Sequence, residues 1–136
     1  MSATATPPRV TPEDLLRMGS DGKRFELIDG KLIERTDHFY SRYVAGNVYS
    51  AIHDYVQPRF LGWVVTGGAG FQCFPDDPSK VRRADTSFIA LDRLTAQQAS
   101  TEGHLRIAPD LVVEVISPND YAKTIKEPSG NNFPTF

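Results

Sequence analysis

The sequence contains only one cysteine, Cys73. A single cysteine excludes an internal disulfide and a zinc site built from several thiolates, and it is typical of a protein in a reducing compartment. No segment approaches the roughly 18 consecutive apolar residues of a membrane-spanning helix. Residues 1–8 also lack the apolar segment of a signal peptide. We therefore expect a cytoplasmic protein that does not contact a membrane.

An excess of positive charge is lacking too. The 15 Lys and Arg residues are outnumbered by 17 Asp and Glu residues, and the net charge is -2. Proteins that bind nucleic acid tightly usually carry a basic face, so any such contact here must be local. The sequence has no helix-turn-helix pattern, and the glycine-rich residues 67–70 lack the Lys-Ser or helix start of a phosphate-binding loop.

The composition that is present fits one soluble domain. Of the 136 residues, 40% are hydrophobic and 24% are charged, which is enough apolar material for a core. We expect a disordered arm over residues 1–10, one domain over residues 11–120 and a divergent tail over residues 121–136. Three helix-breaking residues in this tail, Pro128, Gly130 and Pro134, cannot continue a helix.

Cap and turn signals predict the order of the elements. Thr11 and Pro12 begin a short helix, and the dipeptide Asp29-Gly30 joins two antiparallel strands in a tight hairpin. Apolar residues at three- and four-residue steps predict a long helix from Tyr40 to the end set by Pro58. Further strands are expected over residues 63–66, 71–74, 81–89 and around Glu114, with a short helix over residues 92–99. This order predicts a mixed α/β layer in which helices cover a small sheet.

One carboxylate, Glu114, lies in the middle of an apolar strand within the segment A-P-D-L-V-V-E-V-I-S-P-N-D, residues 108–120. Alternation along this strand makes both of its faces look buried. An ionised carboxylate removed from water costs several kcal/mol unless it is paired, protonated or bound to a cation. The expected strand over residues 81–89 carries a second acid, Asp85. Two facing strand carboxylates suit a hard divalent cation.

Each acid also has a plain structural interpretation. Glu114 could lie on the solvent side of an edge strand, and Asp85 could begin a strand or cap a turn.

Three segments together resemble a known family. In order, F-E-L-I-D-G at residues 25–30, R-R-A-D-T-S-F-I at residues 82–89 and the Glu114 segment resemble the Uma-two family, described as putative restriction endonucleases. The resemblance covers roughly residues 11–120. That family is similar to the PD-(D/E)xK nuclease superfamily. The resemblance implies a restriction-endonuclease-like fold, a mixed sheet flanked by helices, and hydrolysis of nucleic-acid phosphodiester bonds with Mg²⁺ or Mn²⁺, with DNA favoured over RNA.

The resemblance also assigns roles to acids. It implies that Asp85 and Glu114 are the metal ligands and that Glu26 is an auxiliary acid near them. For Glu26, a surface salt bridge with Arg24 or Lys31 is an equally natural interpretation.

A catalytic lysine is harder to place. In the superfamily a lysine often lies two residues after the Glu, but this position is Ile116 here. In the Uma-two family a lysine on a later helix replaces it. That helix and the closing strand are not recognisable after Asp120, so we expect them to be missing and hypothesise a truncated or frame-shifted copy. Lys123 and Lys126 are the available substitutes, although both could simply face solvent.

Basic residues precede Asp85. Lys80, Arg82 and Arg83 would suit contact with a phosphate backbone beside a metal site, and the alternative is a solvated loop and strand start.

Three classes of function therefore remain open. The first is a Mg²⁺-dependent endonuclease. The second is a catalytically inactive relic of the nuclease fold or an interaction module. The third is an unrelated metal-assisted hydrolase that uses the same two acids. A sheet that lacks a closing strand exposes an unpaired edge, so we also expect low solubility or a homodimer.

Overall fold

The computed structural model describes residues 8–35 and 38–116, so the expected N-terminal arm and divergent tail lie largely outside the described residues. The described chain combines helices with two small antiparallel sheets, which confirms the predicted mixed α/β architecture. The helices are α1 (Pro12–Arg17), α2 (Phe39–Val56) and α3 (Ala96–Ser100), with short 3-10 turns η1 (Gly19–Arg24), η2 (Gln57–Arg59) and η3 (Leu91–Arg93). The strands are β1 (Phe25–Ile28), β2 (Lys31–Glu34), β3 (Gly62–Thr66), β4 (Thr86–Ala90) and β5 (Leu111–Val113).

Local sequence signals set the N-terminal unit. Thr11 and Asp14 form a reciprocal capping box at the start of α1, with Pro12 in its first turn. Strands β1 and β2 pair antiparallel around Asp29 and Gly30, whose φ angles are +52° and +73°. Two consecutive positive φ values are what a type I′ hairpin turn requires, so the predicted hairpin is confirmed.

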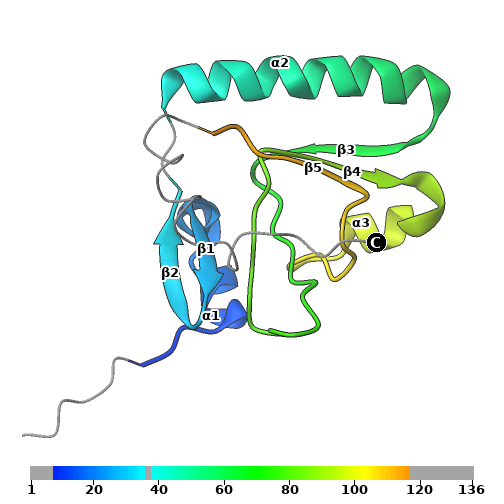
Figure 1. The fold of residues 1–136 in the computed structure, drawn as a ribbon. Coiled ribbons are helices and arrows are strands. Elements are labelled where there is room, and N and C mark those ends of the chain that lie inside the picture. Colours follow the sequence, from blue (N-terminus) through cyan, green and yellow to red (C-terminus); the bar gives the residue numbers. More distant parts are fainter. Residues whose placement is uncertain (1–7, 36–37, 117–136) are drawn as a thin grey trace, which may run out of the picture.

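The second sheet has the order β3-β4-β5, and both of its strand pairs are antiparallel. Helix α2 runs along this sheet beside β3, and the β1–β2 hairpin lies to one side together with α1 (Figure 1). Close approach is needed at Gly62, opposite Ala90, because a Cβ atom there would lie 2.1 Å from the carbonyl oxygen of Ile89.

Several expected elements are shorter than predicted. Residues 71–74 are not a strand, because Phe71 makes only isolated bridges, to Arg82 on one side and Leu105 on the other. Pro75 follows soon after and cannot donate a ladder hydrogen bond. Likewise β4 begins only at Thr86, and the expected helix over residues 92–99 is divided into η3 and α3. Strand propensity predicted extended chain at these places but could not predict where pairing partners end.

The core is built from two clusters. Leu15, Leu27 and Val81 are almost fully buried between α1 and the hairpin. Phe71, Ile89 and Leu94 form the second cluster under the three-stranded sheet, with Cys73 packed against its edge. Burial raises the pKa of the Cys73 thiol to about 11, which agrees with a small core residue rather than a reactive thiol.

Helix α2 has the extent that the sequence predicts, but none of its faces is fully buried. Among its residues only Val56 is buried, and the aromatic side chains Phe39, Tyr40, Tyr43 and Tyr55 are 59–90% exposed. The described chain therefore covers only part of the apolar surface that the periodicity of α2 predicts. No helix in the described part of the chain is both long and apolar enough to span a membrane.

Residues 81–83 join the hairpin to the three-stranded unit. Val81 and Leu27 exchange two backbone hydrogen bonds of 2.9 Å. Arg83, 5% exposed, donates to three carbonyl oxygens, those of Phe25 at 2.9 Å, Gly68 at 2.8 Å and Gly22 at 3.3 Å. One buried guanidinium thus satisfies backbone acceptors from three separate segments.

We predict that Arg83→Met lowers the free energy of unfolding by about 3 kcal/mol, because it leaves several buried carbonyl groups without their charged donor. Urea denaturation measures the change. Arg24→Met is the matched control, since the Arg24 side chain is 61% exposed. Equal losses in the two variants would contradict the structural role of Arg83.

Candidate metal and nuclease site

The strand register brings Asp85 and Glu114 together. The last paired residues of β4 and β5 are Thr86 and Val113. Asp85 precedes Thr86 and Glu114 follows Val113, so continuing the antiparallel register places the two acids opposite each other. Opposed residues in such a pair have Cβ atoms about 5 Å apart. The predicted juxtaposition of these two acids therefore agrees with the register.

Glu114 differs from expectation in its surroundings. β5 ends at Val113, so Glu114 lies just beyond the paired strand and the residue as a whole is exposed, as are Leu111 and Ile116, although its carboxyl group lies among other side chains. The prediction that both faces of this strand are buried is wrong. The physical reason is that β5 pairs only with β4 in the described sheet, so burial by neighbours on its outer side does not follow from apolar alternation.

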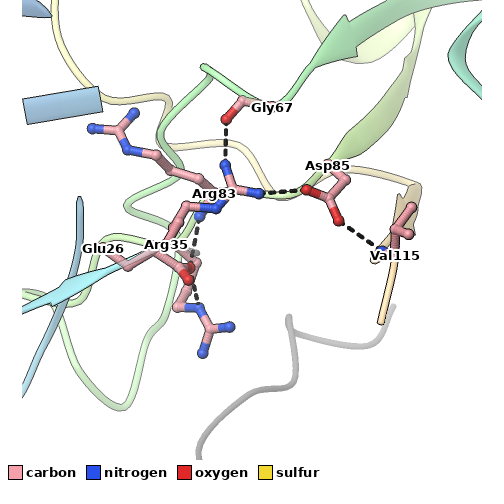
Figure 2. Close-up of polar contacts among 7 residues, drawn as sticks. Glu26, Arg35, Gly67, Arg83, Asp85 and Val115 are labelled. Atoms are coloured by element: carbon pink, nitrogen blue, oxygen red, sulfur yellow. Dashed lines mark hydrogen bonds and ion pairs between the residues drawn. The ribbon is translucent and has the colours of Figure 1, made fainter. Parts of the chain in front are cut away.

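Asp85 is held by two hydrogen bonds. Arg35 donates from Nη2 to Oδ1 at 2.6 Å, and the Val115 backbone N–H donates to Oδ2 at 2.7 Å. The same Arg35 guanidinium donates from Nη1 to the carbonyl oxygen of Gly67 at 2.6 Å, so it bridges Gly67 and Asp85 (Figure 2). Only 19% of the Asp85 side chain is exposed, and this carboxylate is therefore fixed in one orientation.

Glu26 lies on β1 and contacts residues 82 and 83, the arginine-rich segment that precedes β4. Its Oε2 accepts a hydrogen bond from Arg82 Nε at 2.5 Å. The same oxygen accepts from the Arg83 backbone N–H at 2.9 Å (Figure 2). The side chains of Glu26 and Arg82 are 12% and 8% exposed. The alternative of a surface salt bridge with Arg24 or Lys31 is wrong, because the partner of Glu26 is a buried arginine. A role of Glu26 as an auxiliary acid stays a prediction.

The surroundings of Glu114 change the pKa of its carboxyl group. Burial of its carboxyl group, followed by repulsion from Asp85 and Glu26, raises the pKa of Glu114 to about 7, while Arg35 and Arg82 oppose the shift. Because the residue retains solvent contact, water screens part of this effect. Asp85 and Glu26 thus both contribute to the raised pKa of Glu114.

The predicted basic residues occupy different environments. Arg82 and Arg83 are 6% and 5% exposed and make internal hydrogen bonds, so they do not form a solvated phosphate-binding surface in this arrangement. Their burial arises because both bind acceptors of the neighbouring segments. Lys80 is partly exposed, with its ammonium group 5.0 Å from the centre of the Phe74 ring. Contact of these residues with nucleic acid stays a prediction.

The described residues contain none of the predicted catalytic lysines. Ile116 stands at the position where the superfamily often has a lysine, and its side chain is 53% exposed. Lys123 and Lys126, the predicted substitutes, lie outside the described residues. Their proposed role is a prediction that the described chain does not test.

Two functional or structural side chains were missed by sequence reasoning. Arg35 ends the hairpin as one more charged residue, and its partner Asp85 is 50 positions away. Asp110, the acid of the Ala-Pro-Asp motif, accepts a hydrogen bond from the Ala90 N–H at 2.7 Å and pairs with Arg93 at 2.8 Å. The Ala90 hydrogen bond, in particular, lowers the pKa of Asp110. Asp110 thus fastens the start of β5 to the end of β4.

The residues fit a metal site with two protein carboxylates. In the part of the chain that the structure describes, no group of three or more His, Cys, Asp or Glu side chains is placed to hold a metal ion. Mg²⁺ commonly uses only one or two carboxylates and keeps several waters. Burial and repulsion from Asp85 and Glu26 both disfavour the ionised form of Glu114, and a bound cation would favour that form. Asp85 and Glu114 are therefore an acceptable donor set, with Glu26 engaged by arginine.

A separate cavity in the described chain is not lined by these acids. Its volume is about 520 Å³, and its mostly apolar lining includes Trp63, Phe71, Leu94 and His104 but none of Glu26, Asp85 and Glu114. Size alone would favour this cavity as a binding site. The acid cluster is nevertheless the better candidate for chemistry, because it combines opposed carboxylates with a perturbed pKa.

A comparison with known protein families identifies the family of this chain. The family model Uma2, described as "Putative restriction endonuclease", matches residues 12–127. This match covers most of the chain and extends past Asp120, where the predicted domain ends. The chain belongs to this family.

A solved structure supports the same fold. It is the crystal structure of a putative nuclease belonging to DUF820 from Anabaena variabilis, with a TM-score of 0.63 and 18% sequence identity. The similarity covers 88% of this chain and 65% of that nuclease, so the chain spans just under two thirds of the nuclease's length. A search of curated proteins found no significant match.

We predict that Glu114→Gln stabilises the metal-free protein above pH 7 by roughly 1 kcal/mol, after allowance for solvent screening. The pKa of Glu114 is raised from 4.5 to about 7, so the folded protein binds more protons than the unfolded chain between these pH values. Stability from this group therefore falls as pH rises from about 4.5 to 7. Thermal melts in EDTA at pH 5 and pH 8 measure the difference, with exposed Glu102→Gln as the control. A variant that gains no stability at pH 8 relative to pH 5 would contradict the assignment.

Proposed function

We propose that this protein is a divalent-metal-dependent endonuclease that hydrolyses phosphodiester bonds of nucleic acid, with DNA as the favoured substrate. The observation that carries the proposal is the register of the β4–β5 ladder, which when continued by one residue sets Asp85 opposite Glu114, together with the raised pKa of Glu114, about 7. Membership in a family described as putative restriction endonucleases gives these acids a chemical context.

Asp85 and Glu114 would hold Mg²⁺ or Mn²⁺. When bound, such an ion polarises a phosphoryl oxygen and lowers the pKa of a water molecule. The chain's own residues orient the site: Arg35 and the Val115 N–H fix both oxygens of Asp85. Glu26 and Arg82 neutralise each other beside the pair. Lys123 or Lys126 would supply the positive group near the attacking water. Among Lys80, Arg82 and Arg83, Lys80 is the most exposed and so the best placed to contact a phosphate backbone.

We predict that calorimetry with Mn²⁺ detects one binding site in the wild-type protein and that Asp85→Asn weakens it at least tenfold, because one of two anionic ligands is lost. Asp76→Asn, a change of an exposed loop acid, is the matched control and should bind as the wild type does.

Nicking of supercoiled plasmid with Mg²⁺ or Mn²⁺ tests the reaction itself, with Asp85→Asn, Glu114→Gln, Lys123→Ala and Lys126→Ala compared with the wild type. Loss of cleavage in the two acid variants supports the nuclease. Absence of metal binding favours the inactive relic or interaction module instead. Metal binding without cleavage of DNA or RNA favours a different metal-assisted hydrolase.

We also propose self-association as a homodimer. The exposed side chains of Phe39, Tyr40, Tyr43, Tyr55 and Phe60 place a large apolar area in contact with water. We predict that light scattering coupled to size-exclusion chromatography finds a dimer or larger species, and that Tyr40→Ser with Tyr43→Ser reduces it. A monodisperse wild-type monomer would disprove this assembly.

A further inference from the structure

We infer that Arg35 is a positioning residue that competes with the divalent cation for Asp85 and so sets the metal affinity of the site. This inference rests on the proposed metal site. It concerns a residue that neither the acid motif nor the family resemblance singles out, and it follows from the contacts that Arg35 makes in the folded chain.

The backbone of Arg35 is fixed by the hairpin. Its N–H donates to the carbonyl oxygen of Arg24 at 2.8 Å, one residue beyond the last pair of β1 and β2. The Arg35 side chain is 13% exposed, so it is largely shielded from water. The side chain of this hairpin arginine therefore contacts Asp85, beside the other sheet, rather than solvent.

The guanidinium is held at both ends. Nη1 reaches the carbonyl oxygen of Gly67 and Nη2 reaches Asp85 Oδ1, each at 2.6 Å, as Figure 2 shows. This fork geometry is specific to arginine, because an ammonium group cannot hold two separate acceptors in a plane in the same way. Even if the Asp85 bond lengthens, the Gly67 bond keeps the positive charge beside the site.

A cation bound by Asp85 would meet this charge directly. A guanidinium 2.6 Å from Oδ1 is close to any ion that the same carboxylate ligates, and the two positive charges repel each other strongly where water is partly excluded. In the metal-free protein the same guanidinium offsets the charge of Asp85. Arg35 thus stabilises the empty site and opposes its filling, and only a strongly attracted divalent ion can share Asp85 with it.

The test is calorimetric titration with Mn²⁺ alone, on wild type and Arg35→Gln, after removal of bound metal with EDTA. We expect Arg35→Gln to bind Mn²⁺ about tenfold more tightly, equal to about 1.4 kcal/mol, although its metal-free form melts at a lower temperature. A merely structural role of Arg35 predicts the lower melting temperature together with unchanged or weaker affinity, and that result would overturn the inference.

Two further variants sharpen the comparison. Arg24→Gln changes an exposed arginine of the same hairpin and should keep the wild-type affinity; a tenfold gain there would also overturn the inference. Arg35→Lys keeps the charge but cannot hold Gly67 and Asp85 together, so it should bind Mn²⁺ a few times more tightly than the wild type. If Arg35→Gln does not fold, Arg35→Lys decides, and equal or weaker binding rejects the competition.

The outcomes separate this inference from the proposed function. Metal binding by the wild type with no gain in Arg35→Gln rejects the competition alone. Absence of Mn²⁺ binding in the wild type and in every Arg35 variant rejects both the competition and the metal site.

Discussion

Buried arginine contacts are the interactions on which the rest of the described fold depends. In the described residues the two sheets share no strand ladder, and an isolated bridge joins Leu27 of β1 to Val81, which precedes β4 in the chain. Arg83 reinforces it by donating to carbonyl oxygens of three segments. Arginine suits this position because its planar guanidinium presents five donors and keeps its charge when buried.

The same arginine-rich segment positions the acids. Arg82 binds Glu26 of β1, and Asp85 follows two residues after Arg83, directly before β4. Because β4 pairs with β5, the position of Asp85 also determines which residue of the later segment lies opposite it, namely Glu114. Structural linkage and the candidate site are therefore carried by one short stretch of chain, and a change in the linkage would shift the acids as well.

How much could be predicted from sequence follows from the range of each interaction. The capping box at Thr11 and the turn at Asp29-Gly30 depend on residues three or fewer apart, and both were predictable. The pairing of Asp85 with Glu114 was predictable from a motif and strand order. The bond between Arg35 and Asp85 was not, because it joins residues 50 positions apart and nothing local in the hairpin distinguishes Arg35 from its charged neighbours.

Burial was the least predictable property. Apolar alternation in the segment around Glu114 and apolar periodicity in α2 both indicate surfaces that can be covered, but they do not say what covers them. In the described chain α2 buries only Val56, and Glu114 keeps solvent contact beyond the end of β5. Periodicity is a property of one segment, whereas burial depends on a second segment at the right distance.

The distribution of partners explains why Glu114 is the perturbed acid. Arg82 pairs with Glu26, Arg35 pairs with Asp85, and the guanidinium of Arg83 donates to backbone carbonyl oxygens. The attraction that Arg35 and Arg82 still exert on Glu114 does not offset its burial and its repulsion by two acids, so its pKa rises. The three acids and the three arginines already balance in formal charge, so a fourth arginine would make this cluster net positive and would repel a cation. In the proposed site, a divalent ion would give Glu114 the close positive partner that the three arginines give to other acceptors.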